Sequence, residues 1–276
     1  MPLRFTKMQG CGNDFIVIDR TRQPFDPTPD LVRRLADRHF GIGCDQLLLI
    51  SRSDRDTVDL DYRIFNADGG EVSQCGNGLR CVARYARDHG LVNTDRMVVA
   101  SQAGLAYPEL HGDGSVTVDM GPPRFDPAAI PFEAPGVALD YAIAVGGETQ
   151  RIAVLSMGNP HAVLQVPDCT NAPVQRIGEA LSRDPAFPEG VNVGFLQIEN
   201  RHRVQLRVHE RGSGETLACG TGACAAVVAG IRWGKLAAEV QVALPGGELT
   251  IRWEGGERAV LLRGPAITVF EGEITL

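Results

Sequence analysis

Two cysteines stand out because each directly precedes a Gly-x-Gly pattern. The chain has the sequence CGNG over residues 75–78 and CGTG over residues 219–222. A cysteine at the start of a helix lies at the positive end of the helix dipole, which favours the reactive thiolate. The glycines let free backbone N–H groups approach a carboxylate closely. We therefore expect Cys75 and Cys219 each to open a helix that presents a thiol beside an anion-binding backbone.

Two such thiols acting on one substrate would permit racemisation. If both helix starts bind one carboxylate, Cys75 and Cys219 lie on opposite faces of the adjacent carbon. One thiol then takes the proton and the other delivers a new one, while the N–H dipoles stabilise the carbanion. A cysteine can also be a small buried hydrophobe. That second interpretation is kept for Cys11, Cys44, Cys81, Cys169 and Cys224.

The two motifs belong to an internal repeat. Asn66–Gly76 (NADGGEVSQCG) matches Glu210–Gly220 (ERGSGETLACG) at an offset of 210 − 66 = 144 residues. Gly12–Asn13 recurs as Gly158–Asn159, 158 − 12 = 146 residues later. Such a repeat predicts two similar domains, 1–121 and 122–264, related by an approximate two-fold axis. If the domains face each other, the two cysteines meet at the cleft between them, a favoured kind of ligand site.

Local patterns predict a mixed α/β structure in each half. Helices are expected at Gly78–His89 and Gly222–Trp233, each followed by a glycine that can end it, and the second is apolar enough to be buried. Strands are expected at Phe15–Asp19, Leu47–Ile50, Ser115–Met120 and Ala153–Leu155, with a hairpin formed by Ile251–Trp253 and Ala259–Leu262. The proline-rich segment Pro122–Pro135 is expected to link the halves.

Polar residues at equivalent places in the repeat fit a zwitterionic substrate. The pairs are Asn13 with Asn159, Asn66 with Glu210, and Gln46 with Asn192. Any one of these asparagines, taken singly, is better explained as a turn or cap residue.

Two further residues near these positions are candidates for the site. His161 follows Asn159 closely and is assigned a role in tuning thiol pKa values. Arg211 can bind a second carboxylate through its planar fork, or form a surface ion pair.

Composition limits the alternatives. The 276-residue chain carries a net charge of −7 with a pI near 5.4, which argues against binding to nucleic acid or an acidic membrane. No apolar run approaches the ~18–20 residues of a membrane span, and the start does not resemble a signal peptide, so a cytoplasmic protein is expected. Seven cysteines without a C-x2-C pair favour thiols over disulfides or structural zinc.

Five motifs resemble those of the diaminopimelate epimerase family. They are QGCGNDFIVID (9–19), GIGCDQLL (41–48), FNADGGEVSQCGNGLRC (65–81), GNPHAV (158–163) and ERGSGETLACGTGACA (210–225). The resemblance spans essentially the whole chain. It implies conversion of LL-2,6-diaminopimelate to the meso isomer without cofactor or metal, in lysine and peptidoglycan-precursor synthesis.

The resemblance also implies a fold, an assembly and a site. The fold is α/β with two pseudo-symmetric domains, each a curved mixed or antiparallel sheet around a central helix, and the tail 265–276 packs on the first domain. A homodimer is implied, with Phe270 a candidate contact. Cys75 and Cys219 become the acid/base pair, with His161 and Glu210 tuning them. The substrate-binding set is Asn13, Gln46, Asn66, Gly76, Asn77, Asn159, Asn192, Glu210, Arg211, Gly220 and Thr221.

Two departures from the family pattern are mild: Cys11 sits where the family varies, and Ser101–Gly104 replaces a frequent Thr-x-x-Gly.

Two other functions remain open. A proline racemase or hydroxyproline epimerase would use the same two thiols but needs to hold only one carboxylate and a ring nitrogen. Arg211, Asn66 and Asn192 are better explained by a second, distal amino-acid group. A thiol redox or metal-binding protein would use the cysteines differently, and the absence of C-x-x-C counts against it.

Overall fold

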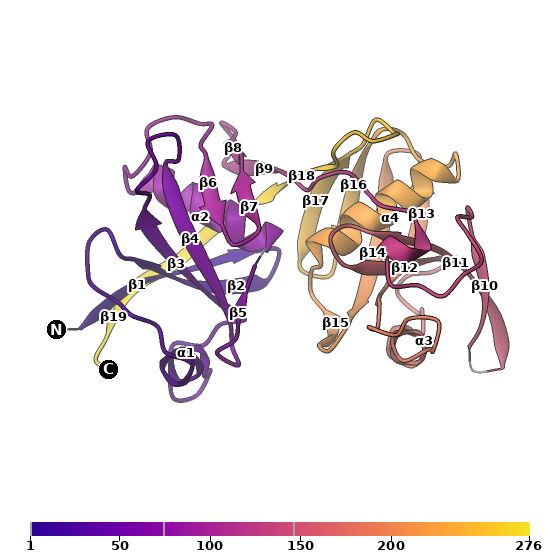
Figure 1. Ribbon diagram of the computed structural model, residues 1–276, viewed down its shortest axis with the longest axis horizontal. Helices are drawn as coiled ribbons and strands as arrows, with labels where there is room; N and C mark the ends of the chain where they lie inside the picture. The colour runs from indigo at the N-terminus through magenta and orange to yellow at the C-terminus, as the bar shows by residue number, and fades with distance from the viewer. Residues whose placement is uncertain (1, 74, 146) are drawn as a thin grey trace. The chain divides into compact units, whose positions relative to one another are not determined.

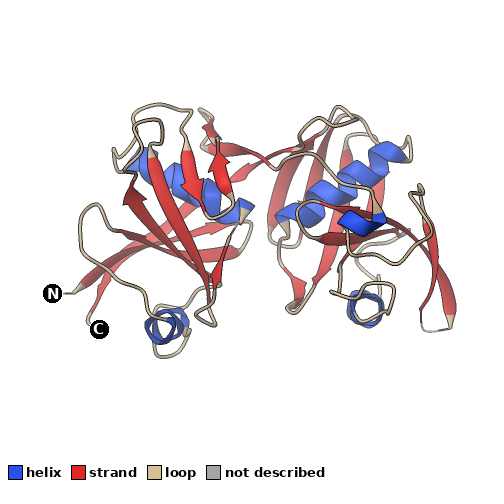
Figure 2. Cartoon of the chain, in the orientation of Figure 1, coloured by secondary structure: helices blue, strands red, loops and turns tan. Residues whose placement is uncertain are grey.

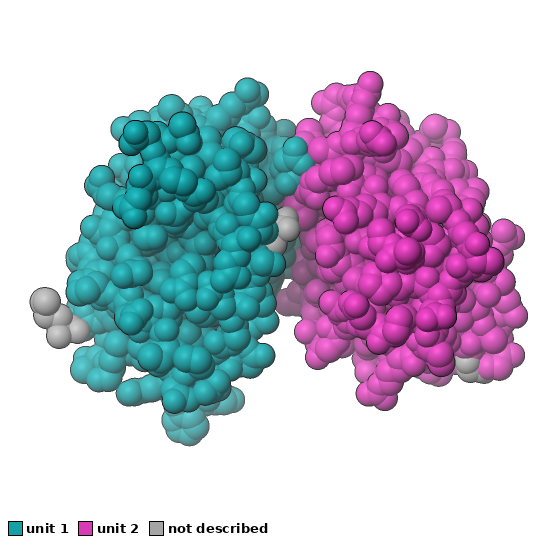
Figure 3. Space-filling view, viewed as in Figure 1, with its two compact units in different colours: residues 1–119, 263–276 teal, residues 120–262 magenta. Residues whose placement is uncertain are grey.

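The computed structural model describes residues 2–73, 75–145 and 147–276. The chain divides into two compact units, coloured separately in Figure 3. Unit 1 comprises Met1–Asp119 with Arg263–Leu276, and unit 2 comprises Met120–Leu262. Each boundary lies two residues before the one expected from the sequence. The strand β18 (Leu261–Pro265) carries the chain from unit 2 back into unit 1.

Unit 1 is built on one curved sheet with the strand order β19-β1-β2-β3-β4-β6-β7. Along the chain these are β1 (Leu3–Gly10), β2 (Asn13–Asp19), β3 (Gln46–Arg52), β4 (Leu60–Asn66), β6 (Val99–Ser101), β7 (Gly104–Ala106) and β19 (Ile267–Ile274). β2 and β3 are parallel, and α1 (Pro29–Ala36) joins them. The short β5 (Glu71–Val72) pairs with β4, and β8 (Glu109–Leu110) pairs with β9 (Ser115–Asp119).

Unit 2 repeats this order as β10-β11-β12-β13-β14-β16-β17. Its strands are β10 (Tyr141–Val145), β11 (Glu148–Ser156), β12 (Pro160–Gln165), β13 (Asn192–Asn200), β14 (Arg203–Glu210), β16 (Glu239–Leu244) and β17 (Gly247–Arg252). The parallel pair β12 and β13 is joined by α3 (Val174–Ser182), and β15 (Gly214–Thr216) pairs with β14. The place of β10 is taken in unit 1 by the C-terminal strand β19, which pairs with β1.

The correspondence extends to residue pairing. Phe15 pairs with Gln46 in unit 1, and His161 pairs with Asn192 in unit 2, both 146 residues later. The predicted fold class, mixed α/β with a repeated architecture, is therefore confirmed.

Each sheet curves around a long central helix, as Figures 1 and 2 show. These helices are α2 (Gly76–Asp88) and α4 (Gly220–Arg232), and each begins two residues before the predicted start. Gly90 and Gly234 follow them with φ of 68° and 72°, the left-handed conformation expected of a residue that ends a helix. Residues 222–230 of α4 are all buried, as its apolar composition predicted.

The central strands are apolar on both faces because both faces are covered. In unit 1, Ile16 and Leu47 pack in one core cluster with Leu35 of α1. The alternate residues Phe15 and Leu48 lie on the opposite face, where a Cβ added at Gly78 of α2 would meet them at 3.5 and 3.0 Å. The strand pattern is thus continuous rather than alternating, as in other sheets buried on both sides.

The prediction that Pro122–Pro135 links the two halves is wrong, because this segment is part of unit 2 and contributes side chains to its core. It contains the 3-10 turn η1 (Pro127–Ala129), and Ile130 is fully buried. Phe132 stacks on Phe187 at 4.8 Å between ring centroids and meets Tyr141 edge-on at 4.7 Å. Proline content indicated a connection, but Ile130 and Phe132 of this segment are buried in the hydrophobic core of unit 2.

The remaining local expectations agree with the structure. The four predicted strands lie within β2, β3, β9 and β11, apart from Met120, which follows β9. The hairpin appears as the adjacent strands β17 and β18, with Trp253 just outside the first and the second beginning at Leu261. No helix in the described part of the chain is long and apolar enough to cross a membrane.

Replacing Phe132 tests the corrected role of this segment. Phe132→Ala should lower the free energy of unfolding of unit 2 by about 3–5 kcal/mol, because it removes a buried ring and leaves a cavity. Chemical denaturation measures this, with Phe40→Ala as the control, since Phe40 is 88% exposed. If the two variants have the same denaturation midpoint, the segment does not contribute to the core and the linker interpretation holds.

Candidate functional site

Both motif cysteines are the N-cap residues of their helices. Cys75 and Cys219 have extended backbone conformations, with φ of −150° and −117°, so the helix begins directly after each. Their sulfur atoms accept hydrogen bonds from the N–H groups of Gly78 and Gly222, each at 3.4 Å. The thiol therefore occupies the place where a serine or aspartate oxygen caps an ordinary helix.

The fourth residue of each motif must be glycine because the helix start packs closely on the sheet. A Cβ added at Gly222 would lie 3.1 Å from the Val208 side chain and 3.2 Å from the sulfur of Cys219. At Gly78 the nearest atom would be a Leu48 methyl at 3.0 Å. The glycines thus permit both the close approach to the strands and the N–H contact to sulfur.

In unit 1, Asn13 lies beside Cys75 because a tight hairpin places it there. Cys11 and Gly12 both have positive φ, 53° and 82°, and connect the paired residues Gly10 and Asn13. This is the turn geometry that suits the twist of a two-residue hairpin. The Asn13 Oδ1 atom lies 4.0 Å from the Cys75 sulfur and accepts a hydrogen bond from Asn77 Nδ2 at 3.1 Å.

Gln46 and Asn66 meet at the same end of the sheet. They are paired residues of β3 and β4, and Gln46 Nε2 donates to Asn66 Oδ1 at 2.8 Å. Gln46 Oε1 is buried and has no hydrogen-bond partner among the described residues. This carbonyl oxygen is therefore a buried acceptor left unused beside the Asn66 side chain.

In unit 2, a chain of polar contacts leads from His161 to Cys219. His161 Nε2 lies 3.0 Å from Asn159 Oδ1, and Asn159 Nδ2 donates to Thr221 Oγ1 at 3.4 Å. The Thr221 hydroxyl is 3.6 Å from the sulfur of Cys219. His161 is therefore linked to the Cys219 thiol through Asn159 and Thr221.

Burial and nearby charges shift the pKa values of His161 and Cys219, the two ends of this series of hydrogen bonds. Burial, and after it the nearby Arg211, lowers the pKa of His161 to about 3, so its ring is neutral at neutral pH. Burial raises the pKa of Cys219 well above its usual value, and the Glu210 carboxylate adds to this. Hydrogen bonds from Thr221 and Gly222 act in the opposite direction and favour the thiolate. Glu210 itself accepts a hydrogen bond from the Thr216 hydroxyl.

Asn192 and Arg211 are tied to each other through the backbone. Asn192 Nδ2 donates to the Pro160 carbonyl at 3.0 Å, and its Oδ1 accepts from the Arg211 N–H at 3.0 Å. The side chain of Asn192 thus holds the starts of β12 and of the turn after β14. The Arg211 side chain is exposed, with Nη1 donating to the Glu189 carbonyl at 2.7 Å.

The predicted residues thus form one cluster in each unit. Around Cys75 the structure gathers Asn13, Gly76 and Asn77, with Gln46 and Asn66 on the neighbouring strand ends; around Cys219 it gathers Asn159, His161, Glu210, Gly220 and Thr221. Asn192 and Arg211 lie at the adjoining strand ends. No group of three His, Cys, Asp or Glu side chains suited to a metal ion occurs among residues 2–73, 75–145 and 147–276.

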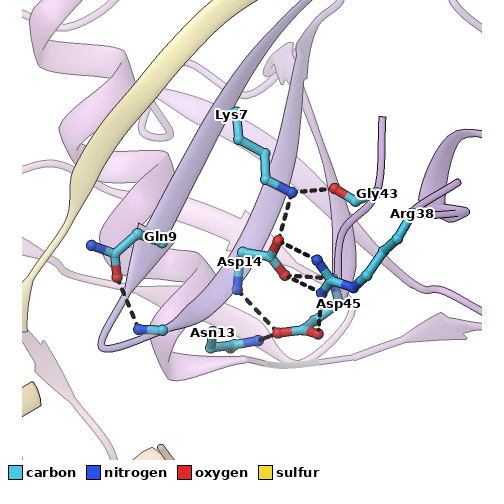
Figure 4. A network of polar contacts seen from close by, with 8 residues as sticks. Lys7, Gln9, Asn13, Asp14, Arg38, Gly43 and Asp45 are labelled. Carbon is cyan, nitrogen blue, oxygen red and sulfur yellow. Dashed lines mark hydrogen bonds and ion pairs between the residues drawn. The ribbon is translucent and has the colours of Figure 1, made fainter. Parts of the chain in front are cut away.

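Two residues that touch the unit 1 cluster were missed by the sequence analysis. Arg80 is fully buried in α2 and donates to Asn77 Oδ1 at 2.9 Å. Asp45 accepts from Asn13 Nδ2 at 2.8 Å (Figure 4). A signal existed for Arg80, because an arginine in a helix expected to pack against the sheet needs a polar partner. No pattern pointed to Asp45, since its contact with Asn13 joins residues 32 positions apart.

Comparison with known proteins gives a consistent result. The family model described as diaminopimelate epimerase matches residues 5–125 and 153–269. The diaminopimelate epimerase of Aromatoleum aromaticum is 56% identical over 274 residues, covering 99% of each chain. That of Nitrosomonas europaea is 55% identical over 276 residues, covering 100% of each.

Solved structures share the fold at low sequence identity. A PhzF-family phenazine biosynthesis protein from Bacillus anthracis aligns with a TM-score of 0.71 and 16% identity, covering 100% of both chains. A hydroxyproline epimerase from Agrobacterium vitis aligns with a TM-score of 0.68 and 17% identity, covering 99% of this chain and 92% of the other. At this level of identity the likeness establishes the architecture alone.

The depressed pKa of His161 predicts a specific pH dependence of stability. Because its folded-state pKa of about 3 lies below the ordinary value, the unfolded chain takes up the proton first, and stability falls as pH drops from about 6.5 toward 3. Between these pH values the free energy of unfolding should change more steeply with pH in the parent than in His161→Gln, by up to about 1.4 kcal/mol per pH unit. Denaturation at several pH values measures the difference, and parallel curves would contradict a buried neutral imidazole.

Proposed function

The chain belongs to the diaminopimelate epimerase family, and from this premise we propose that it converts LL-2,6-diaminopimelate to the meso isomer with Cys75 and Cys219 as acid and base. The observation that carries the proposal is the matched pair of cysteine caps, each 3.4 Å from the third N–H of its helix. A packing role explains a buried cysteine, but it does not explain two sulfur atoms placed identically at the starts of two equivalent helices.

The reaction exchanges one proton on the α-carbon. The thiolate on one face takes the α-proton, which leaves a carbanion next to the carboxylate. The thiol on the opposite face then gives its proton to the carbon and inverts the configuration. One cysteine must therefore start ionised and the other protonated, and the two have exchanged states at the end.

The helix starts account for the stabilisation of that carbanion. The N–H groups that follow Cys75 and Cys219, including those of Gly76 and Gly220, are at the positive ends of their helices. A carboxylate bound there is polarised in the manner of an oxyanion hole. No cofactor is part of this proposal, because the charge is held by backbone dipoles.

The amide and acidic side chains hold the rest of the substrate. We assign contacts with the ammonium and carboxylate groups to the substrate-binding set already named. Arg211 binds the distal carboxylate, which takes no part in the reaction. His161 acts through Asn159 and Thr221 on the Cys219 thiol, and Glu210 acts on it directly.

The proposal also covers the cellular compartment, the use of the product and the oligomeric state. The product would serve lysine and peptidoglycan-precursor synthesis in the cytoplasm. The functional form would be a homodimer with Phe270 at the interface. Phe270 lies on the edge strand β19, is 47% exposed and meets Phe5 edge-on at 5.9 Å between ring centroids.

Incubation with LL-diaminopimelate in deuterated water tests the function and both cysteines together. The parent should form the meso isomer and incorporate deuterium at the α-carbon. Cys75→Ala and Cys219→Ala should each lose more than about 99% of activity, as expected when an acid/base group is removed. Cys169→Ala is the control, a buried cysteine outside both clusters. Activity above a few per cent in either site variant would defeat the two-base mechanism.

Arg211→Lys tests the distal carboxylate. Lysine keeps the charge but loses the planar fork, so kcat/KM should fall by about 10- to 100-fold through misplacement of the reacting carbon, while the melting temperature stays unchanged. Arg183→Lys serves as control, an exposed arginine of the same unit paired with Glu179. Faster racemisation of proline than of diaminopimelate by the parent would replace this function with that of a proline racemase, and unfolding of Arg211→Lys would make Arg211 structural.

A further inference from the structure

A directed chain of hydrogen bonds passes through Asn13 in unit 1. Arg80 Nη1 donates to Asn77 Oδ1 at 2.9 Å, and Asn77 Nδ2 donates to Asn13 Oδ1 at 3.1 Å. Asn13 Nδ2 then donates to Asp45 Oδ2 at 2.8 Å. Every link runs in the same direction, from α2 to the start of β2 and on to the residue before β3.

The residues at the two ends determine this direction. The guanidinium of Arg80 has only donors, so Asn77 must turn its carbonyl oxygen toward it. The carboxylate of Asp45 has only acceptors, so Asn13 must turn its NH2 group toward Asp45. Because Arg80 orients the Asn77 amide and Asp45 orients the Asn13 amide, the Asn13 oxygen faces Asn77. It also faces the sulfur of Cys75, which is 4.0 Å away.

The Asp45 carboxylate is held on both of its oxygens. Oδ1 accepts from Arg38 Nη2 at 2.9 Å, and Oδ2 also accepts from the Asp14 N–H at 3.1 Å. Arg38 in turn forms a two-pronged pair with Asp14, whose carboxylate also contacts Lys7 at 2.6 Å (Figure 4). Burial alone would raise the pKa of Asp14, but the bonds from Arg38 and Lys7 lower it well below its usual value. Asp14 is therefore held as a carboxylate at neutral pH.

The equivalent sequence positions of unit 2 do not carry these charged side chains. The residues 146 positions after Asp14 and Asp45 are Pro160 and Val191, and the residue 144 positions after Arg80 is Cys224. There the amide is turned the other way: Asn159 directs its NH2 group to Thr221 and its oxygen to His161. Asn13 thus presents its oxygen toward Cys75, whereas Asn159 presents its NH2 group to Thr221, whose hydroxyl lies 3.6 Å from the Cys219 sulfur.

We propose, resting on the function given above, that Asp45 is a positioning residue of the reaction, whose carboxylate turns the Asn13 carbonyl toward Cys75. Asp45 does not reach the sulfur itself. It acts through Asn13, which then accepts from the Cys75 thiol and keeps its carbonyl at the reacting face. Without Asp45 the Asn13 amide loses one of its two anchors and keeps the bond from Asn77, so its carbonyl is held less firmly toward the sulfur.

Three variants separate this role from a structural one. Asp45→Ala removes the acceptor, and Asp45→Asn removes the charge but keeps an oxygen for Asn13. Asp61→Ala is the matched control, because its pair with Arg55 has the same exposure of the arginine, 55%, and a similar N–O distance, 2.8 against 2.9 Å. Should Asp45→Ala fail to fold, Asp45→Ser, whose side chain is too short to reach Asn13, takes its place.

The first readout is turnover of LL-diaminopimelate. Asp45→Ala should lose about 10-fold or more in kcat, as expected when a reacting group is misplaced, whereas Asp45→Asn and Asp61→Ala should stay within about threefold of the parent. In an Asn13→Ala background, Asp45→Ala should cost nothing further, because the two residues act as one unit. Equal losses in all variants, or additive losses in the double variant, would overturn the proposal.

The second readout needs no substrate. Iodoacetamide labelling of Cys75, followed by peptide mass spectrometry, should be faster in Asp45→Ala by about threefold or more, because the thiolate is the reacting form and is no longer opposed by the Asn13 carbonyl. Asp61→Ala should label at the parent rate. An unchanged rate in Asp45→Ala would refute the positioning role. If the parent fails to epimerise diaminopimelate but the labelling rates differ as stated, only the proposed substrate fails.

Discussion

The hydrogen bond from a helix N–H group to a cysteine sulfur is the contact on which each half of this protein depends. A sulfur cap requires the cysteine to be extended, the helix to start at the next residue, and the third residue after it to lack a side chain. It also requires the helix to pack tightly against the sheet, because this packing determines the position of the sulfur atom. The curved sheet, the central helix and the glycines all serve that placement.

The strand ends supply the polar groups around each sulfur. Because β2 and β3 are parallel, with β12 and β13 repeating the arrangement, the starts of adjacent strands lie at the same edge as the helix N-terminus. Gln46 and Asn66 meet there through antiparallel pairing, and Val193 pairs with His209 beside the equivalent positions in unit 2. One topology, used twice, therefore brings polar side chains from several strand ends to the edge of the sheet where the central helix begins.

The two units have similar backbone folds but different charged groups around their motif cysteines. Unit 1 surrounds its thiol with amides anchored between the buried cation Arg80 and the carboxylate of Asp45. Unit 2 has a neutral histidine and a carboxylate near Cys219, whose pKa is raised chiefly by burial. Such a difference suits a reaction in which one thiol must be ionised while the other is protonated, since two identical environments would give both the same preference.

The sequence by itself determined the repeat, the fold class, the two central helices to within two residues and the two cysteine motifs, because glycine positions and apolar periodicity are local properties of the chain. It also indicated Asn13, Asn159 and their partners through equal spacing. Only the tertiary structure decided that Ile130 and Phe132 fill the core of unit 2, since burial depends on what surrounds a segment. It alone revealed the contact of Asp45 with Asn13 and the opposite orientations of the two asparagines, because the direction of an amide is set by donors and acceptors distant in sequence.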